Sequence, residues 1–180
     1  IANLSPDVTW SPDGSRLAAC TNDLTIWDLE STTPIVSFPD ADCERKVSWS
    51  RDGAFLAYST NEAIHIADLA TKSIRITYDG YTMFSWMQSS SELLIASQDG
   101  NIRKVDPKNL TPARDVQVLL PLSQINDIHS SPDGNSIAIE EQGRGVRVVI
   151  ANIRTGDIVS ILDGFRYRTS DVSWSPDGLQ

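Results

Sequence analysis

The chain has 180 residues, of which 40% are hydrophobic and 22% are charged, and its formal net charge is −9. This acidic balance excludes nonspecific binding to nucleic acid or to an anionic membrane, because both need a basic surface. No stretch approaches the roughly 20 apolar residues of a membrane-spanning helix. The sequence also has no glycine-rich phosphate loop, no nucleophile elbow and no histidine pair at metal spacing. We therefore expect a noncatalytic protein that needs no cofactor and no metal.

One short phrase recurs along the chain. It reads VTWSPDG at 8–14, VSWSRDG at 47–53, FSWMQSSSE at 84–92, IHSSPDG at 128–134 and VSWSPDG at 172–178. Its anchor positions, 10, 49, 86, 130 and 174, are 39, 37, 44 and 44 residues apart. A repeat near 40 residues indicates stacked copies of one supersecondary unit. Within the phrase, a short β-prone run precedes a Ser-Pro-Asp-Gly tight turn.

Each of the first four phrases is followed by the same series of elements. The expected second strands are apolar runs at 17–20, 55–58, 93–96 and 137–139. The expected third strands end in an apolar residue followed by an acid or amide: Trp27-Asp28, Ala67-Asp68, Val105-Asp106 and Ala151-Asn152. The expected fourth strands lie at 35–38, 74–78, 116–120 and 158–162. Short strands joined by turns predict an all-β chain of four-stranded antiparallel sheets.

The stretch VTWSPDGSRLAACTNDLTIWDL resembles a blade of the WD-repeat family, with Trp27-Asp28 as the signature dipeptide. The resemblance covers the whole chain and implies a β-propeller. The implied blades are 1–38, 39–78, 79–120 and 121–162, and 163–180 would supply the first strand of a fifth. The Gly-His pair of the family is missing, since the comparable places read Asp79-Gly80-Tyr81 and Asp163-Gly164-Phe165. The family's aspartate in the second turn fits only at Asp99.

The last phrase suggests that this chain is a piece of a larger propeller of about seven blades. Its turn, at 175–178, is not followed by a returning strand. Open blade faces are apolar and promote association. We therefore expect either pairing with the missing blades or head-to-tail self-association, blade 4 of one copy on blade 1 of the next, and no stable monomer.

The two cysteines lie in different surroundings. Cys20 belongs to an apolar strand and is expected in the core, whereas Cys43 lies in the polar loop DADCERK. Two thiols do not make a disulfide framework, so a reducing compartment, the cytoplasm or the nucleus, is expected.

A candidate binding rim lies three residues before each anchor, at Asp7, Lys46, Met83, Asp127 and Asp171. The resemblance places these positions at one mouth of the central channel, where equivalent residues of all blades converge. Three aspartates could form an acidic ring for a basic partner or a cation, or each could cap a nearby backbone N–H. Neighbouring residues would share the rim. The predicted partner-binding set is Asp7, Arg45, Lys46, Tyr81, Thr82, Met83, Asn126, Asp127 and Asp171.

Two functions fit the sequence. The first is a noncatalytic scaffold of WD-repeat type that binds a protein or peptide of basic character. The second is a propeller that accompanies a hydrolase, or a periplasmic Tol-type propeller, since WSPDG before an apolar strand is common there too.

Overall fold

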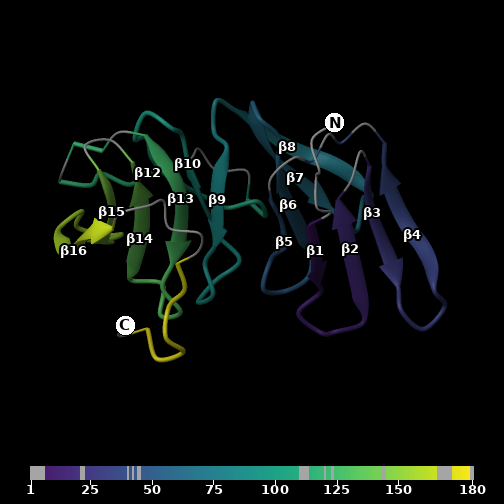
Figure 1. Ribbon diagram of the computed structural model, residues 1–180. Coiled ribbons are helices and arrows are strands. Elements are labelled where there is room, and N and C mark those ends of the chain that lie inside the picture. The colour runs from purple at the N-terminus through teal and green to yellow at the C-terminus, as the bar shows by residue number, and fades with distance from the viewer. Residues whose placement is uncertain are drawn as a thin grey trace. The chain divides into compact units, whose positions relative to one another are not determined.

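The computed structural model describes residues 7–20, 23–39, 41, 43, 46–109, 114–119, 121–122, 124–142, 145–165 and 172–178. Its strands form four antiparallel sheets of four strands, each sheet made of consecutive strands (Figure 1). The all-β prediction is therefore confirmed. In the part of the chain described, no helix is long and apolar enough to cross a membrane.

Each sheet is one blade, numbered in chain order. Blade 1 contains β1 (Asp7–Trp10), β2 (Arg16–Cys20), β3 (Leu24–Asp28) and β4 (Thr33–Phe38). Blade 2 contains β5 (Lys46–Trp49), β6 (Phe55–Ser59), β7 (Ala63–Asp68) and β8 (Ser73–Asp79). Blade 3 contains β9 (Met83–Trp86), β10 (Leu93–Ala96), β11 (Ile102–Val105) and β12 (Arg114–Asp115). Blade 4 contains β13 (Ile125–Ser130), β14 (Ser136–Glu141), β15 (Val146–Asn152) and β16 (Ile158–Phe165).

The Ser-Pro-Asp-Gly turn forms by local hydrogen bonds. In blade 1, Ser11 Oγ donates to Asp13 Oδ1 at 2.6 Å, and the N–H of Gly14 donates to the carbonyl of Ser11 at 2.9 Å. Gly14 has a φ of 71°, which favours glycine. Bonds from Ser11 and Ser15 lower the pKa of Asp13 to about 2. The same Ser–Asp bond recurs in blades 2 and 4 and at 175–177.

The acid or amide at the end of each third strand shapes the next turn. Asp28 Oδ1 accepts the backbone N–H groups of Glu30 at 3.0 Å and Ser31 at 2.9 Å. The side-chain oxygens of Asp68, Asp106 and Asn152 each accept the backbone N–H of the residue two positions later in the same way. The Trp-Asp signature therefore has a local role here, because its carboxylate satisfies the turn's backbone donors.

The blades group into two compact units, Ile1–Gly80 and Tyr81–Gln180, each with its own core. In the first unit, blade 1 residues such as Leu24 and Ile26 pack with Trp49 and Leu56 of blade 2. In the second unit, Met83 and Leu94 of blade 3 pack with residues of blade 4 such as Ile128, Ile137 and Ile139. Each unit is thus a pair of sheets packed through apolar side chains.

The fourth strand of blade 3 differs from its prediction. The expected strand was 116–120, but β12 covers only Arg114–Asp115, and 116–119 lie outside any strand. The N–H of Val116 still donates to the carbonyl of Ile102 at 2.9 Å, but the N–H of Leu119 donates to Gly156 of blade 4. The chain leaves the sheet because its backbone groups find partners in the next blade. Residue 120 lies outside the described residues.

The expectation of unpaired cysteines was wrong. Cys20 and Cys43 form a disulfide with a Cα–Cα distance of 5.7 Å. Cys43 is 8% exposed and belongs to the core of the first unit, although its neighbours in sequence are polar. The pairing depends on how blade 2 packs on blade 1, which spacing along the chain does not reveal.

Candidate functional site

The structure places part of the predicted rim at strand starts. Asp7, Lys46 and Met83 each begin the first strand of a blade, whereas Asp127 is the third residue of β13. The side chain of Asp7, and all of Arg45 and Asp171, lie outside the described residues. Of the three aspartates, only Asp127 therefore has a described environment.

Asp127 accepts a hydrogen bond from its own strand and lies near a histidine. Its Oδ1 accepts the N–H of Ile128 at 2.8 Å, which is the capping role considered as the alternative to an acidic ring. Its Oδ2 lies 3.8 Å from Nε2 of His129, and Oε1 of the buried Glu140 lies 3.2 Å from the same nitrogen. Within the described ranges, no group of three or more His, Cys, Asp or Glu residues is arranged to hold a metal ion.

Three other rim residues, Met83, Thr82 and Asn126, are engaged in packing or pairing. Met83 is 4% exposed and belongs to the core of the second unit, and Thr82 Oγ1 donates to its sulfur at 2.9 Å. Asn126 Nδ2 donates to Gln142 Oε1 at 3.4 Å. The side chain of Met83 thus offers a partner little surface.

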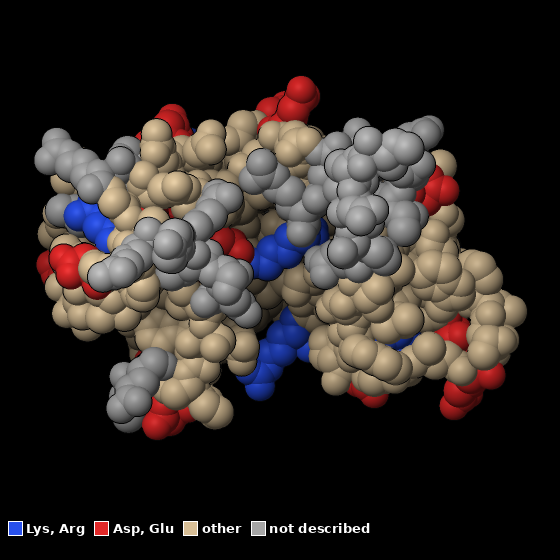
Figure 2. Space-filling model, viewed as in Figure 1, with Lys and Arg blue, Asp and Glu red and all other residues tan. Residues whose placement is uncertain are grey.

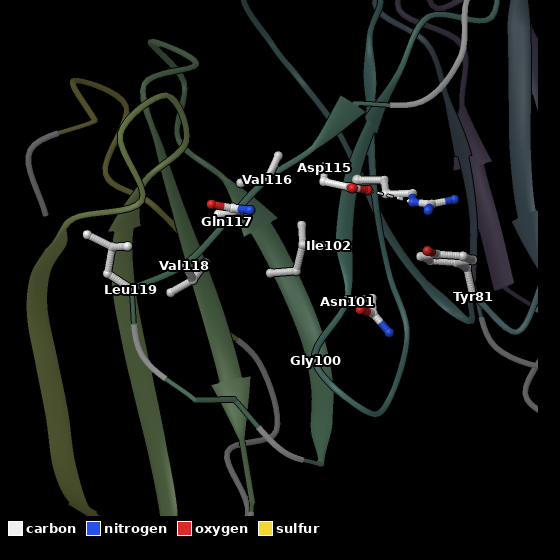
Figure 3. Close-up of a pocket in the computed structure, with 10 residues that line it drawn as sticks. Tyr81, Gly100, Asn101, Ile102, Asp115, Val116, Gln117, Val118 and Leu119 are labelled. Carbon is white, nitrogen blue, oxygen red and sulfur yellow. Dashed lines mark hydrogen bonds and ion pairs between the residues drawn. The ribbon is translucent and has the colours of Figure 1, made fainter.

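Tyr81 lies in the wall of a pocket of about 480 Å³ in the second unit (Figure 3). Aliphatic side chains line one part of this pocket: Ile102, Val116, Val118 and Leu119. Polar or aromatic side chains line it as well: Tyr81, Asn101, Arg103 and Asp115, and also Gln117, which Figure 3 places between Val116 and Val118. We refer to it as the blade 3 pocket.

Arg103 links the polar residues of this pocket. Its Nε donates to Asp115 Oδ1 at 2.8 Å, and its guanidinium carbon lies 5.6 Å from the centroid of the Tyr81 ring. This hydrogen bond, which the Asp115 carboxylate accepts, raises the pKa of Arg103 further above its ordinary range. The side chains of Arg103 and Asp115 are 42% and 67% exposed, so both remain accessible to a ligand.

The pocket exists because β12 ends early. After Asp115 the chain departs from β11, and Figure 3 shows Val116, Gln117, Val118 and Leu119 following one another along this departing segment. Two glycines let it pass closely. A Cβ at Gly156 would overlap the carbonyl oxygen of Gln117. A Cβ at Gly100 would lie 2.8 Å from the carbonyl oxygen of Leu122, slightly further along the chain.

Of the residues that line this pocket, Tyr81 belongs to the predicted partner-binding set, whereas Arg103, Asp115 and Asn101 were not predicted. One signal was present. The spacing from the acid or amide of the third strand to the next apolar run is 10 residues in blade 3 (106 to 116), but 7, 6 and 6 in the other blades (28 to 35, 68 to 74, 152 to 158). A longer connection at one repeat indicates an inserted, functional loop.

The arrangement is suited to binding. An arginine at cation–π distance from a tyrosine, beside an exposed carboxylate and aliphatic side chains, can anchor a side chain that has both apolar and charged parts. We find no nucleophile–base pair among the residues that line it.

No protein-family model matches the chain, and no curated protein matches it. Solved structures do match, 1315 chains in all, among them one titled hydrazine synthase from Kuenenia stuttgartiensis. That likeness has a TM-score of 0.77 at 18% identity and covers 99% of this chain. The chain has a propeller-like fold. It spans 55% of the length of the matched chain, and so low an identity supports the fold of four-stranded sheets alone.

Proposed function

We propose that this chain is a noncatalytic binding module of WD-repeat type, and that it holds a protein or peptide partner at the ends of its blades. The blade 3 pocket carries the proposal. It places Tyr81 and Arg103 in contact, and both residue types are enriched among the residues that dominate binding energies at interfaces. The adjoining aliphatic wall can remove part of the partner from water.

The charge of the chain favours a basic partner. The formal net charge is −9, and Figure 2 shows acidic side chains at several separate places on the visible face rather than in one patch. A distributed negative field steers a basic partner toward the surface. At the pocket itself, the exposed Asp115 can accept a lysine or arginine of that partner.

An array of 12-residue peptides with net charges from −4 to +4 tests this function. We expect binding to rise with positive charge and to weaken with added salt. Tyr81→Ala should lower the affinity of the bound peptides about tenfold, which corresponds to about 1.4 kcal/mol. Tyr78→Ala is the matched control, because it removes a tyrosine of the first unit.

Equal binding by Tyr81→Ala and the unchanged chain would contradict the pocket. Binding that does not depend on peptide charge would contradict the basic partner. A turnover of substrate assigned to this chain would contradict the noncatalytic role.

One observation favours the second candidate, a periplasmic propeller. The cytoplasmic or nuclear location expected from the sequence rested on unpaired thiols, and Cys20 and Cys43 form a disulfide. Structural disulfides persist in oxidising compartments such as the periplasm. Because both cysteines are buried, cells are quenched in acid and the protein is alkylated in denaturant: modified thiols then indicate the cytoplasm, and thiols protected by the disulfide indicate the oxidising compartment.

A further inference from the structure

The blade 3 pocket lies in a fork between two parts of the chain that begin as a strand pair. The short β12 pairs with β11 through Arg114 and Asp115, and after Asp115 the chain departs from β11. Residues 100–103 line one arm of the pocket and 115–119 line the other. We name 116–119 the departing segment, and the space between the two arms the fork. All of these residues belong to the second unit.

Backbone pairing at the start of the fork is incomplete. The N–H of Val116 donates to the carbonyl of Ile102 at 2.9 Å. In a complete antiparallel pair, the N–H of Ile102 would also donate to the carbonyl of Val116. Among the described residues, neither of these two groups has a hydrogen-bond partner. Ile102 is 3% exposed, and an unpaired backbone N–H in a buried residue costs free energy.

The departing segment turns one edge toward blade 4. A Cβ at Gly156 would overlap the carbonyl oxygen of Gln117, and the N–H of Leu119 donates to the carbonyl of Gly156 at 2.9 Å. Backbone groups of successive residues in an extended chain point to opposite edges. Since Gln117 and Leu119 face blade 4, the N–H and C=O of Val118 point, like those of Val116, into the fork.

The backbone of Val118 is open at this edge. Within the part of the chain that the structure describes, its N–H and its C=O make no hydrogen bond. Figure 3 shows Ile102 on one arm of the fork and Val116 and Val118 on the other. Positions 116 and 118 are two residues apart, which is about 7 Å along a strand. This spacing is the repeat of the hydrogen-bonding groups along one edge of another extended chain.

At two other places between blades, the chain itself supplies a partner for the backbone. Trp49 Nε1 of blade 2 donates to the carbonyl of Thr9 in blade 1 at 3.1 Å. Trp174 Nε1 donates to the carbonyl of His129 in blade 4 at 3.0 Å. None of the described side chains that line the pocket supplies such a bond to Val118. The fork therefore has a vacancy for backbone groups from outside.

We propose that an extended peptide segment enters the fork and adds a strand to the departing segment, with one of its residues bonded to both the N–H and the C=O of Val118. This inference rests on the proposed function, since it specifies how the blade 3 pocket holds its peptide. Main-chain bonds of this kind supply affinity, and neighbouring side chains supply specificity. The exposed Asp115 beside the fork selects a basic side chain on the added strand. A volume of about 480 Å³ lies within the range of natural ligand sites, so a few residues fill it.

The probe is a nine-residue peptide of alternating lysine and valine, blocked at both ends. Two methylated forms are made, one with N-methyl groups on every lysine amide and one with N-methyl groups on every valine amide. Each form loses the donors of one edge and keeps all side chains. We expect the unmodified probe to bind in isothermal titration calorimetry, and one of the methylated forms to bind at least tenfold more weakly.

Paired substitutions test the same bonds from the side of the chain. Val118→Pro and Val118→Ala both shorten the side chain, but only proline removes the N–H. We expect the proline variant to bind the probe at least tenfold more weakly than the alanine variant. Gln117→Pro and Gln117→Ala are the matched control pair, because the N–H of Gln117 points away from the fork. These two variants should differ less than twofold.

Hydrogen exchange followed by NMR reports the bond directly. In the free chain the amide of Val118 should exchange fast. In the complex with the unmodified probe its exchange should slow at least tenfold, while the amide of Gln117 keeps its rate. This measurement and the methylated probes use the unchanged chain, so they decide the matter even where Val118→Pro does not fold.

The outcomes separate this inference from the function on which it rests. Equal affinity of the unmodified probe and both methylated forms would overturn the added strand, and so would unchanged exchange of Val118 in the saturated complex. If Tyr81→Ala still weakens peptide binding in either case, the proposed function stands. No binding of the probe, where other basic peptides bind, would overturn the added strand alone. No binding of any peptide would overturn both.

Discussion

The two units of this chain join consecutive blades in different ways. In the first unit, the disulfide from Cys20 to Cys43 ties β2 to the segment that leads into blade 2. In the second unit, the connecting segment from blade 3 is held by backbone bonds at Val116 and Leu119 and by close packing on Gly156.

The difference shows which part of the repeat can vary. The inner strands and their turns are alike in both units, because each must pack on its neighbour. The connection after the fourth strand does not have to pack on a neighbouring sheet. In the first unit this connection carries a disulfide, and in the second unit it lines a pocket. The following predictions test that division, from the largest expected effect to the smallest.

Truncation of an inner strand should cost the same in both units. Leu56 and Leu93 are fully buried and pair with Trp49 and Trp86 in the same register. Leu56→Ala and Leu93→Ala should each lower the free energy of unfolding by about 2–5 kcal/mol, through lost burial and a cavity. Chemical denaturation measures the cost, and hydrogen exchange assigns it to a unit. A cost below about 1 kcal/mol for one of them would contradict the equivalence of the blades.

Loss of the disulfide should affect the first unit alone. The bond closes a separation of 23 residues, for which chain entropy predicts about 3 kcal/mol of stabilisation. Cys20→Ala with Cys43→Ala should therefore unfold earlier in denaturant. Faster hydrogen exchange should appear in blades 1 and 2, while β9, β10 and β11 keep their protection. An unchanged denaturation midpoint would show that the bond contributes nothing.

A methyl group at Gly156 should disturb the second unit. Gly156 and Gly80 have φ values of 77° and 78°, so alanine pays about 1–2 kcal/mol at either position. A Cβ at Gly80 meets no atom within 4 Å, whereas one at Gly156 overlaps the carbonyl of Gln117. Gly156→Ala should cost a further 1–3 kcal/mol and weaken peptide binding at the blade 3 pocket. Equal costs for the two alanines would mean that the connecting segment yields freely.

Acid should loosen the Ser-Pro-Asp-Gly turns in both units. Hydrogen bonds from Ser11 and Ser15 lower the pKa of Asp13 to about 2 from 3.8, and bonds from Ser131 and Asn135 lower that of Asp133. A carboxylate with a lowered pKa stabilises the fold above its ordinary pKa, and this contribution is lost as the pH falls from 3.8 through about 2. Carboxyl-carbon NMR titration measures the midpoints. A midpoint of Asp13 at 3.8 would contradict the hydrogen bonds, and Asp13→Asn should remove the effect.

What could be predicted from the sequence was local. The turn at 11–14 is specified by four adjacent residues, so its repetition indicated the strands on either side. The apolar sequence of 116–120 did not reveal that β12 is short. Val116 still bonds to β11, but Leu119 bonds to Gly156 of blade 4, and sequence alone does not distinguish these two partners. The disulfide depends likewise on packing between two blades.

The candidate site shows the same division. Tyr81 could be named from its place before a first strand, but Arg103 and Asp115 come together only because β11 and β12 pair. The rim position of Met83 was equivalent in sequence to that of Lys46, yet Met83 is buried and Lys46 is partly exposed. Side-chain chemistry, and not position, decides that difference.

The indole bonds of Trp49 and Trp174 have a consequence for how such chains diverge. Their acceptors are main-chain oxygens, which every amino acid carries, and the two acceptor residues are as unlike as threonine and histidine. The neighbouring blade can therefore change its side chain at that position without losing the bond. A duplicated blade can therefore form the same indole bond with its neighbour, and substitutions at the acceptor position do not remove this bond between blades.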